Sequence, residues 1–492
     1  MDTQVQGSTA GGAGTRIPVV LIEGDGIGPE VAAATVRILD AAGAGIEWRP
    51  AVAGAQIFKA GNATGVPQET LDAVAACGLA LKGPLETPVG YGEKSANVTL
   101  RKVFELYGNI RPVRELPGIQ TPFSGRGIDF VIVRENVEDL YAGIEYMQTP
   151  GVAQCLKLIS HKGSEKIARL AFALARAEGR RKVTCATKAN IMKLTEGLFK
   201  RRFEAVAKEY PDIQSEHQIV DNCAHQMVIK PEQFDIVVMT NMNGDILSDL
   251  AAGLVGGLGV APSSNIGREV AMFEAVHGSA PQIAGKGVAN PTALLQAGIM
   301  MLRHIGKFDV AAKVEQALFA VLAEGRQVTG DIARGHPGVG TAQFVDAVLE
   351  KLGTVSGEEP GRRRQRLYAP AENVLGPVAR ERRVVGCDVW IESTATAEEI
   401  GRQVEGLVAN TPLRLKMVSS RGTKVFPAVG FRADAVDQWC LRFMHRSDGG
   451  LDDAALFELM QRLSAAHIRW MNVEKLQRFD GADGFTLAAG ED

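Results

Sequence analysis

The sequence predicts an α/β protein with a largely parallel sheet covered by helices on both faces, followed by a small α+β module. Apolar stretches at 128–136, 182–190 and 234–244 indicate strands, and they alternate with helical patterns at 163–179 and 196–211. Alternation of this kind is typical of parallel sheets built from βαβ units. The 55 glycines among 492 residues imply many tight turns, which such a fold needs.

A second module follows a break in this pattern. Between Gly353 and Pro377 the periodicity disappears and proline, glycine and arginine accumulate, so we place an interdomain linker at 356–382. From 383 to 492 the pattern is strand, helix, strand, strand, helix, strand, which is the order of a split-βαβ sandwich. The predicted elements are strands at 382–393, 414–420, 436–445 and 468–477, and helices at 396–408 and 452–466.

Composition excludes several classes of protein. The formal net charge of −3 provides no basic field that would attract nucleic acid or an anionic membrane. No apolar run approaches the roughly 20 residues needed to cross a bilayer, and the polar, glycine-rich residues 1–16 indicate a flexible cytoplasmic tail. The six cysteines form no C-x-x-C pair, which favours reduced thiols over a zinc site. The expected partners are small molecules and further copies of the chain.

A glycine-rich turn, GDGIG at 24–28, joins the first predicted strand to the first predicted helix. Its G-x-G-x-G spacing differs from the G-x-G-x-x-G of dinucleotide loops, and Pro29 removes an amide donor that a pyrophosphate would use. We therefore interpret it as a structural turn and expect any nucleotide to bind elsewhere.

Groups that bind carboxylates are dense between Lys94 and Arg114. Ser95 and Asn97 fit the start of a helix, and the cations that follow could neutralise a substrate with several carboxylates. A capped helix with solvated arginines is the alternative. Arg134 favours a binding site, because it falls at the carboxyl end of an apolar strand, where open α/β sheets place ligands. The candidate arginines are Arg101, Arg111, Arg114 and Arg134.

Two acids one helical turn apart, Asp245 and Asp249, predict a cation site. Their carboxylates share a helix face, so they should repel each other unless a divalent cation such as Mg²⁺ or Mn²⁺ binds between them. Asp221, which ends a strand, could supply a third oxygen. A solvated helix N-terminus stabilised by the helix dipole is the alternative for the pair.

Three further residues are candidates for chemistry. Tyr141 and Lys188 can act as acid or base when their surroundings shift their pKa, although each could equally be a surface residue. His277 precedes glycine and small residues that let backbone approach a flat or phosphorylated ligand, although an isolated histidine is more often structural.

Seven segments together resemble the β-decarboxylating dehydrogenases, the family of isocitrate and isopropylmalate dehydrogenases. They lie between residues 17 and 350 and read GDGIGPEV, LKGPLETPVG, YGNIRPVR, VIVRENVEDLYAGIE, KANIMKLTEGLF, NMNGDILSDLAAGLVGGLG and FEAVHGSAPQIAGKGVANP. The segment KSANVTLR looks like the isocitrate branch, because Ser95 and Asn97 match positions that bind the substrate's extra carboxylate. The chain length and second module look like the extended, Thermus-like bacterial form.

The resemblance implies an isopropylmalate dehydrogenase-like fold of two subdomains that share a mostly parallel sheet. It implies a large subdomain at 17–106 and 256–355 and a small one at 107–255, with a dimer clasp near 139–160. The implied assembly is a homodimer with shared active sites, or a higher oligomer built from it.

The resemblance also implies the reaction: oxidative decarboxylation of isocitrate to 2-oxoglutarate and CO₂ in the citric acid cycle. Mg²⁺ or Mn²⁺ would act as Lewis acid and template, bound by Asp245, Asp249 and a second subunit's Asp221. Lys188 of the second subunit would help remove the hydroxyl proton, and Tyr141 would protonate the enolate. The implied substrate-binding residues are Lys82, Ser95, Asn97, Arg101, Arg111 and Arg134.

The implied cofactor is NAD⁺ or NADP⁺, bound without a Rossmann loop. Gln282 and Ile283 stand where NADP enzymes of the family commonly carry Lys-Tyr, and Gln282 offers no charge to a 2′-phosphate, so NAD⁺ is favoured. Arg334 and a neighbouring subunit's Lys230 match cationic positions of NADP enzymes and argue the other way. The implied cofactor-binding residues are Thr87, His277, Gly278, Ala280, Gln282, Ile283, Asn290, Asp331 and Arg334.

Three alternatives stay open at this stage. The substrate could be homoisocitrate or isopropylmalate, against which Ser95 and Asn97 argue. The chain could be a non-catalytic regulatory subunit, although the metal acids, Tyr141 and Lys188 are all present. The C-terminal module carries no recognisable site, and its apolar strands favour packing or assembly over effector binding.

Overall fold

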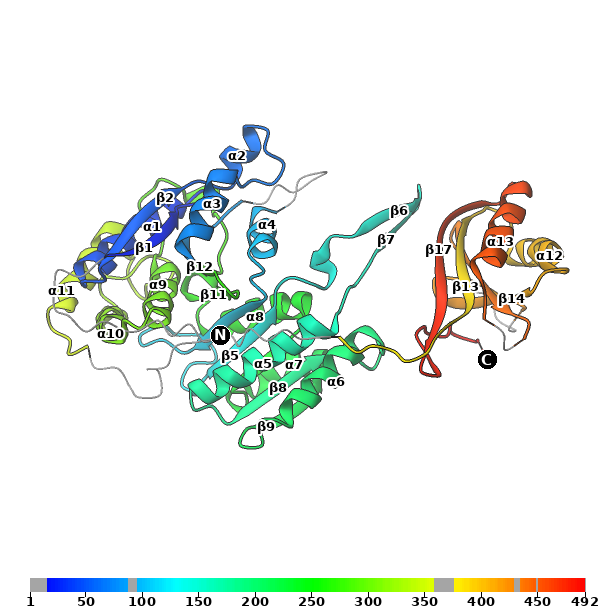
Figure 1. Ribbon diagram of the computed structural model, residues 1–492. Helices are drawn as coiled ribbons and strands as arrows, with labels where there is room; N and C mark the ends of the chain where they lie inside the picture. Colours follow the sequence, from blue (N-terminus) through cyan, green and yellow to red (C-terminus); the bar gives the residue numbers. More distant parts are fainter. Residues whose placement is uncertain (1–15, 87–94, 358–375, 429–433, 448–449, 492) are drawn as a thin grey trace. The chain divides into compact units, whose positions relative to one another are not determined.

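The computed structural model describes residues 16–86, 95–357, 376–428, 434–447 and 450–491. The chain forms two compact units, one of Met1–Tyr141 with Leu158–Val374 and one of Ala142–Lys157 with Leu375–Asp492 (Figure 1). The predicted tail lies outside the described residues except for Arg16, and so does most of the predicted linker.

A ten-stranded sheet organises the first unit, in the order β2-β1-β3-β12-β11-β4-β5-β10-β8-β9. Six of its nine strand pairings are parallel, and the three antiparallel ones are those that β4 and β11 make at its centre. The predicted mostly parallel α/β fold is thus confirmed. The strands are β1 (Ile17–Ile22), β2 (Ile46–Ala51), β3 (Leu79–Lys82), β4 (Gly108–Arg114), β5 (Asp129–Glu135), β8 (Lys182–Thr187), β9 (Gln214–Ile219), β10 (Ile236–Met239), β11 (Pro262–Ile266) and β12 (Ala271–Ala275).

Helices cover both faces of this sheet, as the sequence predicts. One continuous apolar core joins one face to α1, α5, α6, α9, α10 and α11, while two smaller cores join the other face to α3, α4, α7 and α8. The helices are α1 (Gly28–Ala41), α2 (Ala55–Lys59), α3 (Gln68–Cys77), α4 (Ala96–Val103), α5 (His161–Ala177), α6 (Thr195–Ala207), α7 (Val220–Ile229), α8 (Asn241–Val255), α9 (Thr292–His304), α10 (Phe308–Glu324) and α11 (Thr341–Leu352).

The GDGIG turn joins β1 to α1 by close backbone contact. Gly24 and Gly26 have φ of 83° and 60°, and a Cβ on Gly26 would lie 2.0 Å from the carbonyl oxygen of Ser279. Only glycine fits there, because both the left-handed conformation and the missing side chain are required. The turn is therefore tied to the segment that follows β12.

The second unit contains the predicted split-βαβ module. Its sheet has the order β15-β14-β16-β13-β17-β18 with antiparallel neighbours, and α12 and α13 connect the strands in βαβ fashion. Its elements are β13 (Arg382–Glu392), α12 (Ala397–Val408), β14 (Leu413–Ser420), β15 (Thr423–Phe426), β16 (Gln438–His445), α13 (Asp453–Ala465), β17 (Arg469–Phe479) and β18 (Ala482–Asp483). The sequence predicts all of these except the short β15 and β18.

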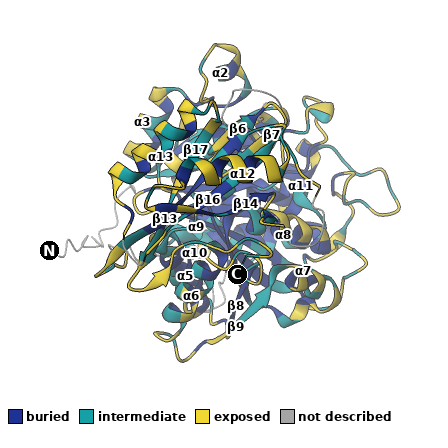
Figure 2. Cartoon of the chain, turned by 90° about the vertical axis from the view of Figure 1, so that its right-hand side faces the viewer, coloured by how far each residue is buried: buried dark blue, intermediate teal, exposed yellow. Residues whose placement is uncertain are grey.

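Local signals explain why this module folds as predicted. The Thr396 side chain accepts a hydrogen bond from the Glu399 amide, and the Glu399 side chain accepts one from the Thr396 amide, so α12 begins with a capping box. Ile400, Val404 and Val408 recur at helical spacing and are buried, whereas the other side of α12 is exposed (Figure 2).

A two-stranded hairpin belongs to the same unit. It consists of β6 (Glu145–Thr149) and β7 (Val152–Cys155), and it lies within the predicted clasp. The Thr149 hydroxyl donates a hydrogen bond of 3.0 Å to Asp437, which lies just before β16. Over the described ranges, no helix is long and apolar enough to span a bilayer.

Candidate active site

A charged pocket of about 110 Å³ lies on the face of the ten-stranded sheet that α4 and α8 cover. Strand ends bring its residues together, because Lys82 ends β3, Glu274 lies near the end of β12, and Arg111 projects from β4. Arg101 and Asn97 reach it from α4. The site thus lies beside the carboxyl ends of parallel strands, as predicted for Arg134.

Glu274 pairs with two of the predicted substrate-binding cations. Its carboxylate lies 2.7 Å from the Lys82 ammonium and 3.1 Å from the Arg101 guanidinium, and it accepts a hydrogen bond of 2.8 Å from Asn265. Burial alone would raise the pKa of Glu274, but Lys82 and Arg101 outweigh burial and lower it. Glu274 therefore stays ionised and holds both cations at the pocket wall.

Arg111 and Arg134 contact the two acids of α8. The Arg111 guanidinium lies 3.5 Å from Asp245 and 3.3 Å from Asp249, and the Arg134 guanidinium donates to Asp245 in a closer contact. Asn241 accepts two further hydrogen bonds from Arg134, at 2.9 and 2.7 Å. Burial lowers the pKa of Arg134 to about 9, and the neighbouring Arg111 and Arg101 act in the same direction.

The acids themselves differ in their surroundings. Burial would raise the pKa of Asp245, but Arg134, the Tyr141 hydroxyl and Arg111 lower it overall. Asp249 is more exposed, and its pKa is raised by burial and by the charge of Asp245. The predicted repulsion between the two carboxylates is therefore present. The arginines stabilise the ionised form of Asp245, whose pKa is lowered, but not that of Asp249, whose pKa is raised.

Tyr141 contacts Asp245, one of the two predicted metal-binding acids. It lies in a short 3₁₀ turn after β5, donates a hydrogen bond to Asp245, and stacks against Arg134 with the guanidinium carbon 4.9 Å from the ring centre. Burial and the hydrogen bond to Asp245 raise the pKa of Tyr141. Its phenol is therefore held protonated within the predicted metal and substrate site.

Two buried polar atoms of the pocket have no hydrogen-bond partner in the part of the chain that the structure describes. They are Asn97 Oδ1 and His277 Nε2. Buried polar groups are normally paired, so these atoms fit a bound polar ligand. Burial also lowers the pKa of His277, which favours the neutral ring. Ser95 is the N-cap residue of α4, in the predicted position.

Lys188 and Asp221 form a separate pair. The Lys188 ammonium donates a 2.7 Å hydrogen bond to Asp221, and this hydrogen bond lowers the pKa of the Asp221 carboxyl. Both side chains are accessible, at 33% and 67%. Among the described residues, no group of three acids, histidines or cysteines could hold a metal ion. One chain alone therefore does not bring Asp221 to Asp245 and Asp249.

A second hollow, of about 680 Å³, adjoins the first through His277 and Gly278. Its wall contains most of the predicted cofactor residues, and Asn290 donates a hydrogen bond of 2.9 Å to Asp331. The predicted residues that line it are His277, Gly278, Ala280, Ile283, Asn290 and Asp331. Gln282 and Arg334 do not line it, although both belong to segments that do, and Thr87 lies outside the described residues.

Several site residues escape the sequence-based prediction. Glu274 is the next-to-last residue of β12, the apolar strand that precedes the predicted His277, so its position near a strand end is a signal that could have identified it. Ser248 lies one turn from Asp245 and accepts a hydrogen bond of 2.6 Å from Arg111. Asn109, Asn241 and Ser263 have no distinguishing sequence signal, because their role depends on contacts between distant segments.

These residues and this fold define a class of protein. Residues 18–348 match the family model described as isocitrate/isopropylmalate dehydrogenase, so the chain belongs to that family. Residues 382–491 match the model described as the C-terminal domain of bacterial isocitrate dehydrogenase. The resemblance drawn from the seven segments is confirmed.

Individual relatives narrow this class. The chain is 56% identical to "Isocitrate dehydrogenase [NADP]" of Thermus thermophilus, over 96% of both chains, and 40% identical to the Rickettsia felis protein of that name, over 96% of this chain and 99% of the other. A crystal structure of a protein from Thermus thermophilus superimposes with a TM-score of 0.94 at 56% identity, over 97% of each chain.

The prediction that NAD⁺ is favoured over NADP⁺ is wrong. The relatives that match along the full length are named for NADP. The prediction gave the uncharged pair Gln282 and Ile283 more weight than the cations Arg334 and Lys230, and this weighting was the error. Arg334 lies about 50 positions after Gln282 in the sequence. It belongs to the loop whose residues Gly330, Asp331 and Pro337 line the second hollow.

Proposed function

We propose that this chain catalyses the metal-dependent oxidative decarboxylation of isocitrate to 2-oxoglutarate and CO₂ with reduction of NADP⁺. Arg101 and Arg111 line one pocket, and Arg111 and Arg134 both contact Asp245 of the pair Asp245 and Asp249; this cluster of cations and acids carries the proposal. A tricarboxylate needs several fixed cations, and a divalent cation needs the acids. The names of the full-length relatives support the substrate and the cofactor.

The cations would bind the substrate's carboxylates. Lys82, Arg101 and Arg111 already line the pocket, and Asn97 presents a buried side-chain oxygen that lacks a partner among the described residues. Because Glu274 holds Lys82 and Arg101 in place before the substrate arrives, these two side chains would lose little entropy on binding.

Asp245 and Asp249 would hold Mg²⁺ or Mn²⁺. Their carboxylates lie one turn apart on α8, the donor type fits a hard cation, and the raised pKa of Asp249 indicates an acid pair short of positive charge. When bound, the metal supplies Lewis acidity at the substrate's hydroxyl and carboxylate oxygens. Arg111 and Arg134 would then turn from these acids toward the substrate.

Tyr141 would deliver the proton that completes 2-oxoglutarate. Its raised pKa keeps the phenol protonated at neutral pH, and its hydrogen bond to Asp245 places the hydroxyl beside the metal-binding residues. A proton donor is required there, because loss of CO₂ leaves an electron pair on the adjacent carbon.

The active site would be completed by a second copy of the chain. Lys188 and Asp221 lie together but away from the other catalytic residues, on the ends of β8 and α7. Ile246 and Leu250 on α8 are 58% and 37% exposed, and they flank the metal-binding acids in the sequence. A homodimer that covers these apolar residues could bring the partner's Lys188–Asp221 pair to the pair of acids.

NADP⁺ would lie in the larger hollow, with its nicotinamide end at His277, where the two pockets meet. The loop residues beside Asp331 would contact the adenosine portion. Arg334, and Lys230 of the neighbouring copy, would bind the 2′-phosphate, because a dianion needs positive partners.

A rate assay with isocitrate tests the whole proposal. We expect formation of reduced nicotinamide with isocitrate, Mg²⁺ and NADP⁺, and complete loss of the rate when a chelator removes the metal. Homoisocitrate and isopropylmalate serve as competing substrates. Faster turnover of either one, or activity that survives chelation, would contradict the proposal.

A further inference from the structure

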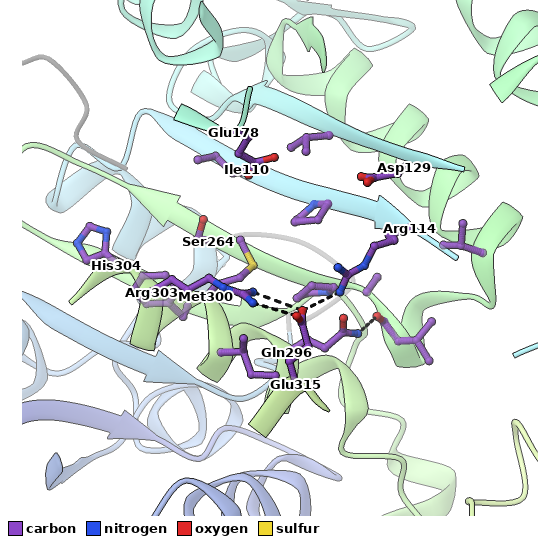
Figure 3. A pocket seen from close by; sticks show the side chains of 18 of the residues that line it. Ile110, Arg114, Asp129, Glu178, Ser264, Gln296, Met300, Arg303, His304 and Glu315 are labelled. Carbon is purple, nitrogen blue, oxygen red and sulfur yellow. Dashed lines mark hydrogen bonds and ion pairs between the residues drawn. The ribbon is translucent and has the colours of Figure 1, made fainter. Parts of the chain in front are cut away.

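A second kind of pocket lies on the opposite face of the same central strands; we call it the back pocket (Figure 3). Alternation along the strands separates the two sites, because successive side chains point to opposite faces. On β11, Ser263 lines the charged pocket, whereas Pro262, Ser264 and Ile266 line the back pocket. On β12, Glu274 lines the charged pocket and Phe273 lines the back pocket.

The back pocket forms where two strands diverge. β4 and β11 pair only through Gly108–Ile110 and Ser264–Ile266, and the rest of β4 pairs with β5 alone. Pro112 and Pro262, which have no amide donor, lie where this pairing stops. Through the resulting gap the pocket reaches Ala252 and Val255 of α8, a helix packed on the other face.

The charges of the back pocket cancel. Arg114 and Arg303 lie 2.8 and 3.0 Å from Glu315, and Figure 3 shows them approaching it from two sides. Arg180 lies 2.8 Å from Asp129 and 2.7 Å from Glu178. Three cations thus face three acids, and most of the remaining wall is apolar. A charged ligand would gain little there and would lose its hydration.

One polar group of the wall points to a ligand. The Ser264 hydroxyl is buried, the residue being 1% exposed, and Oγ has no hydrogen-bond partner within the described part of the chain. A buried hydroxyl without a partner is costly, and a ligand with one donor or acceptor would satisfy it. The pocket volume of about 130 Å³ approaches that of cavities that hold a single aromatic ring.

We propose that the back pocket binds a small uncharged molecule with an apolar body and one hydrogen-bonding group, and that its occupation alters isocitrate binding. The physical link is α8, which carries Asp245 and Asp249 toward the charged pocket and Ala252 and Val255 toward the back pocket. The strands β4, β11 and β12 provide a second link, since each contributes side chains to both pockets.

Binding is tested on the full-length protein by ligand-detected NMR with three probes of one ring size. Phenol should bind saturably, toluene about three- to tenfold more weakly for lack of the hydrogen bond, and benzoate not detectably. Equal binding of all three probes, or of none, would overturn the proposal.

Two variants locate the site. Ala177→Leu, at the end of α5, should fill the pocket and weaken phenol binding at least about tenfold. Its matched control is Ala173→Leu, one turn earlier and outside the pocket, which should bind phenol normally. Ser264→Ala should reduce the preference for phenol over toluene to about one, and it keeps the test valid if the leucine variant does not fold. Unchanged phenol binding in both pocket variants would place the probe elsewhere.

The coupling rests on the proposed function and is measured separately. Saturating phenol should change the KM for isocitrate at least about twofold in the parent and Ala173→Leu proteins, but not in Ala177→Leu. An unchanged KM with confirmed binding would overturn the coupling. A protein without any isocitrate turnover would refute the proposed function instead, while the NMR titration would still decide whether the back pocket binds its ligand.

Discussion

The charged pocket and the back pocket share strands β4, β11 and β12 but differ in almost every physical property. The charged pocket gathers Lys82, Arg101 and Arg111 around acids, and two of its buried polar atoms lack partners among the described residues. The back pocket balances three cations with three acids and is otherwise mostly apolar.

This difference shows that opposite faces of the same strands can serve opposite chemistry. Because successive side chains of a strand point to opposite faces of the sheet, two adjacent residues can belong to different pockets. Glu274 and Phe273 are such a pair, one charged and one apolar. Single substitutions on the charged face should therefore change the rate of turnover. Substitutions on the back face should instead change protein stability and the binding of a ligand in the back pocket.

The largest effect is expected from Asp245→Asn. Loss of a metal-binding carboxylate should lower kcat/KM about a thousandfold or more, because the metal contributes several kcal/mol to the transition state. Steady-state kinetics at saturating Mg²⁺ measure this. Asp346→Asn, which alters an exposed pair with Arg37, is the matched control and should leave the rate unchanged. Near-normal activity of Asp245→Asn would remove this residue from the metal site.

Tyr141→Phe should lower kcat about a hundredfold because proton delivery is lost. The KM for isocitrate should change much less, because the hydrogen bond to Asp245 that is lost with the hydroxyl is one of several contacts that Asp245 makes. The ring and its stacking on Arg134 remain, so the circular dichroism spectrum should not change. Tyr146→Phe, in the hairpin that follows Tyr141 in the sequence, is the control for the loss of a phenol hydroxyl. A rise in KM with unchanged kcat would assign Tyr141 to binding and not to chemistry.

Glu274→Gln should destabilise the protein by about 3–5 kcal/mol, because Lys82 and Arg101 would stay buried without their shared acid. The lowered pKa of Glu274 gives a pH signature. Its stabilising contribution is present above the unfolded carboxyl pKa of about 4.3 and is lost as the pH falls further. Urea unfolding from about pH 7 down to about pH 2, which covers both sides of the unfolded carboxyl pKa, measures both effects. The stability gap between parent and variant should narrow at the acid end, and a constant gap would contradict the ion-pair explanation.

Arg334→Ala should raise the KM for NADP⁺ about ten- to a hundredfold while changing the KM for isocitrate little, since one charge-assisted contact is removed. Initial rates at varied NADP⁺ test this. The conservative Arg334→Lys variant should recover part of the affinity. An equal effect of Arg334→Ala on both KM values would indicate a structural role for this arginine.

Ser264→Ala should have the smallest effect. Removal of a buried hydroxyl that lacks a partner among the described residues should stabilise the protein by about 1 kcal/mol and leave turnover within about twofold. Thermal unfolding measures the first quantity and the standard assay the second. A marked loss of turnover would show that the two faces of β11 are not separable.

Much of the fold follows from the sequence, because it depends on local periodicity. The strands near 128–136, 182–190 and 234–244 and the whole βαββαβ order of the C-terminal module are readable from apolar spacing and capping signals. The short β15 and β18 are too brief for periodicity to show. The central antiparallel pairing of β4 with β11 joins segments about 150 residues apart, which no local pattern records.

The candidate site was readable in part, for a similar reason. Arg134, Asp245 and Asp249 stand at a strand end and on one helix face, so spacing alone marks them. Glu274 lies near the end of an apolar strand, but the sequence does not show that Lys82 and Arg101 reach it from other segments. The prediction of NAD⁺ was wrong because two adjacent uncharged positions, Gln282 and Ile283, were given more weight than the distant cations Arg334 and Lys230.

By itself, the sequence determined the α/β class, the separate C-terminal module, the family resemblance and half of the residues that line the charged pocket. These depend on residue type and short spacing, which a linear chain displays directly. The tertiary structure decided which charges neutralise each other, that Asp221 pairs with Lys188 in the single chain, and that the splayed strands leave a neutral pocket behind the charged one. Such features depend on distances between remote segments, and only packing sets those distances.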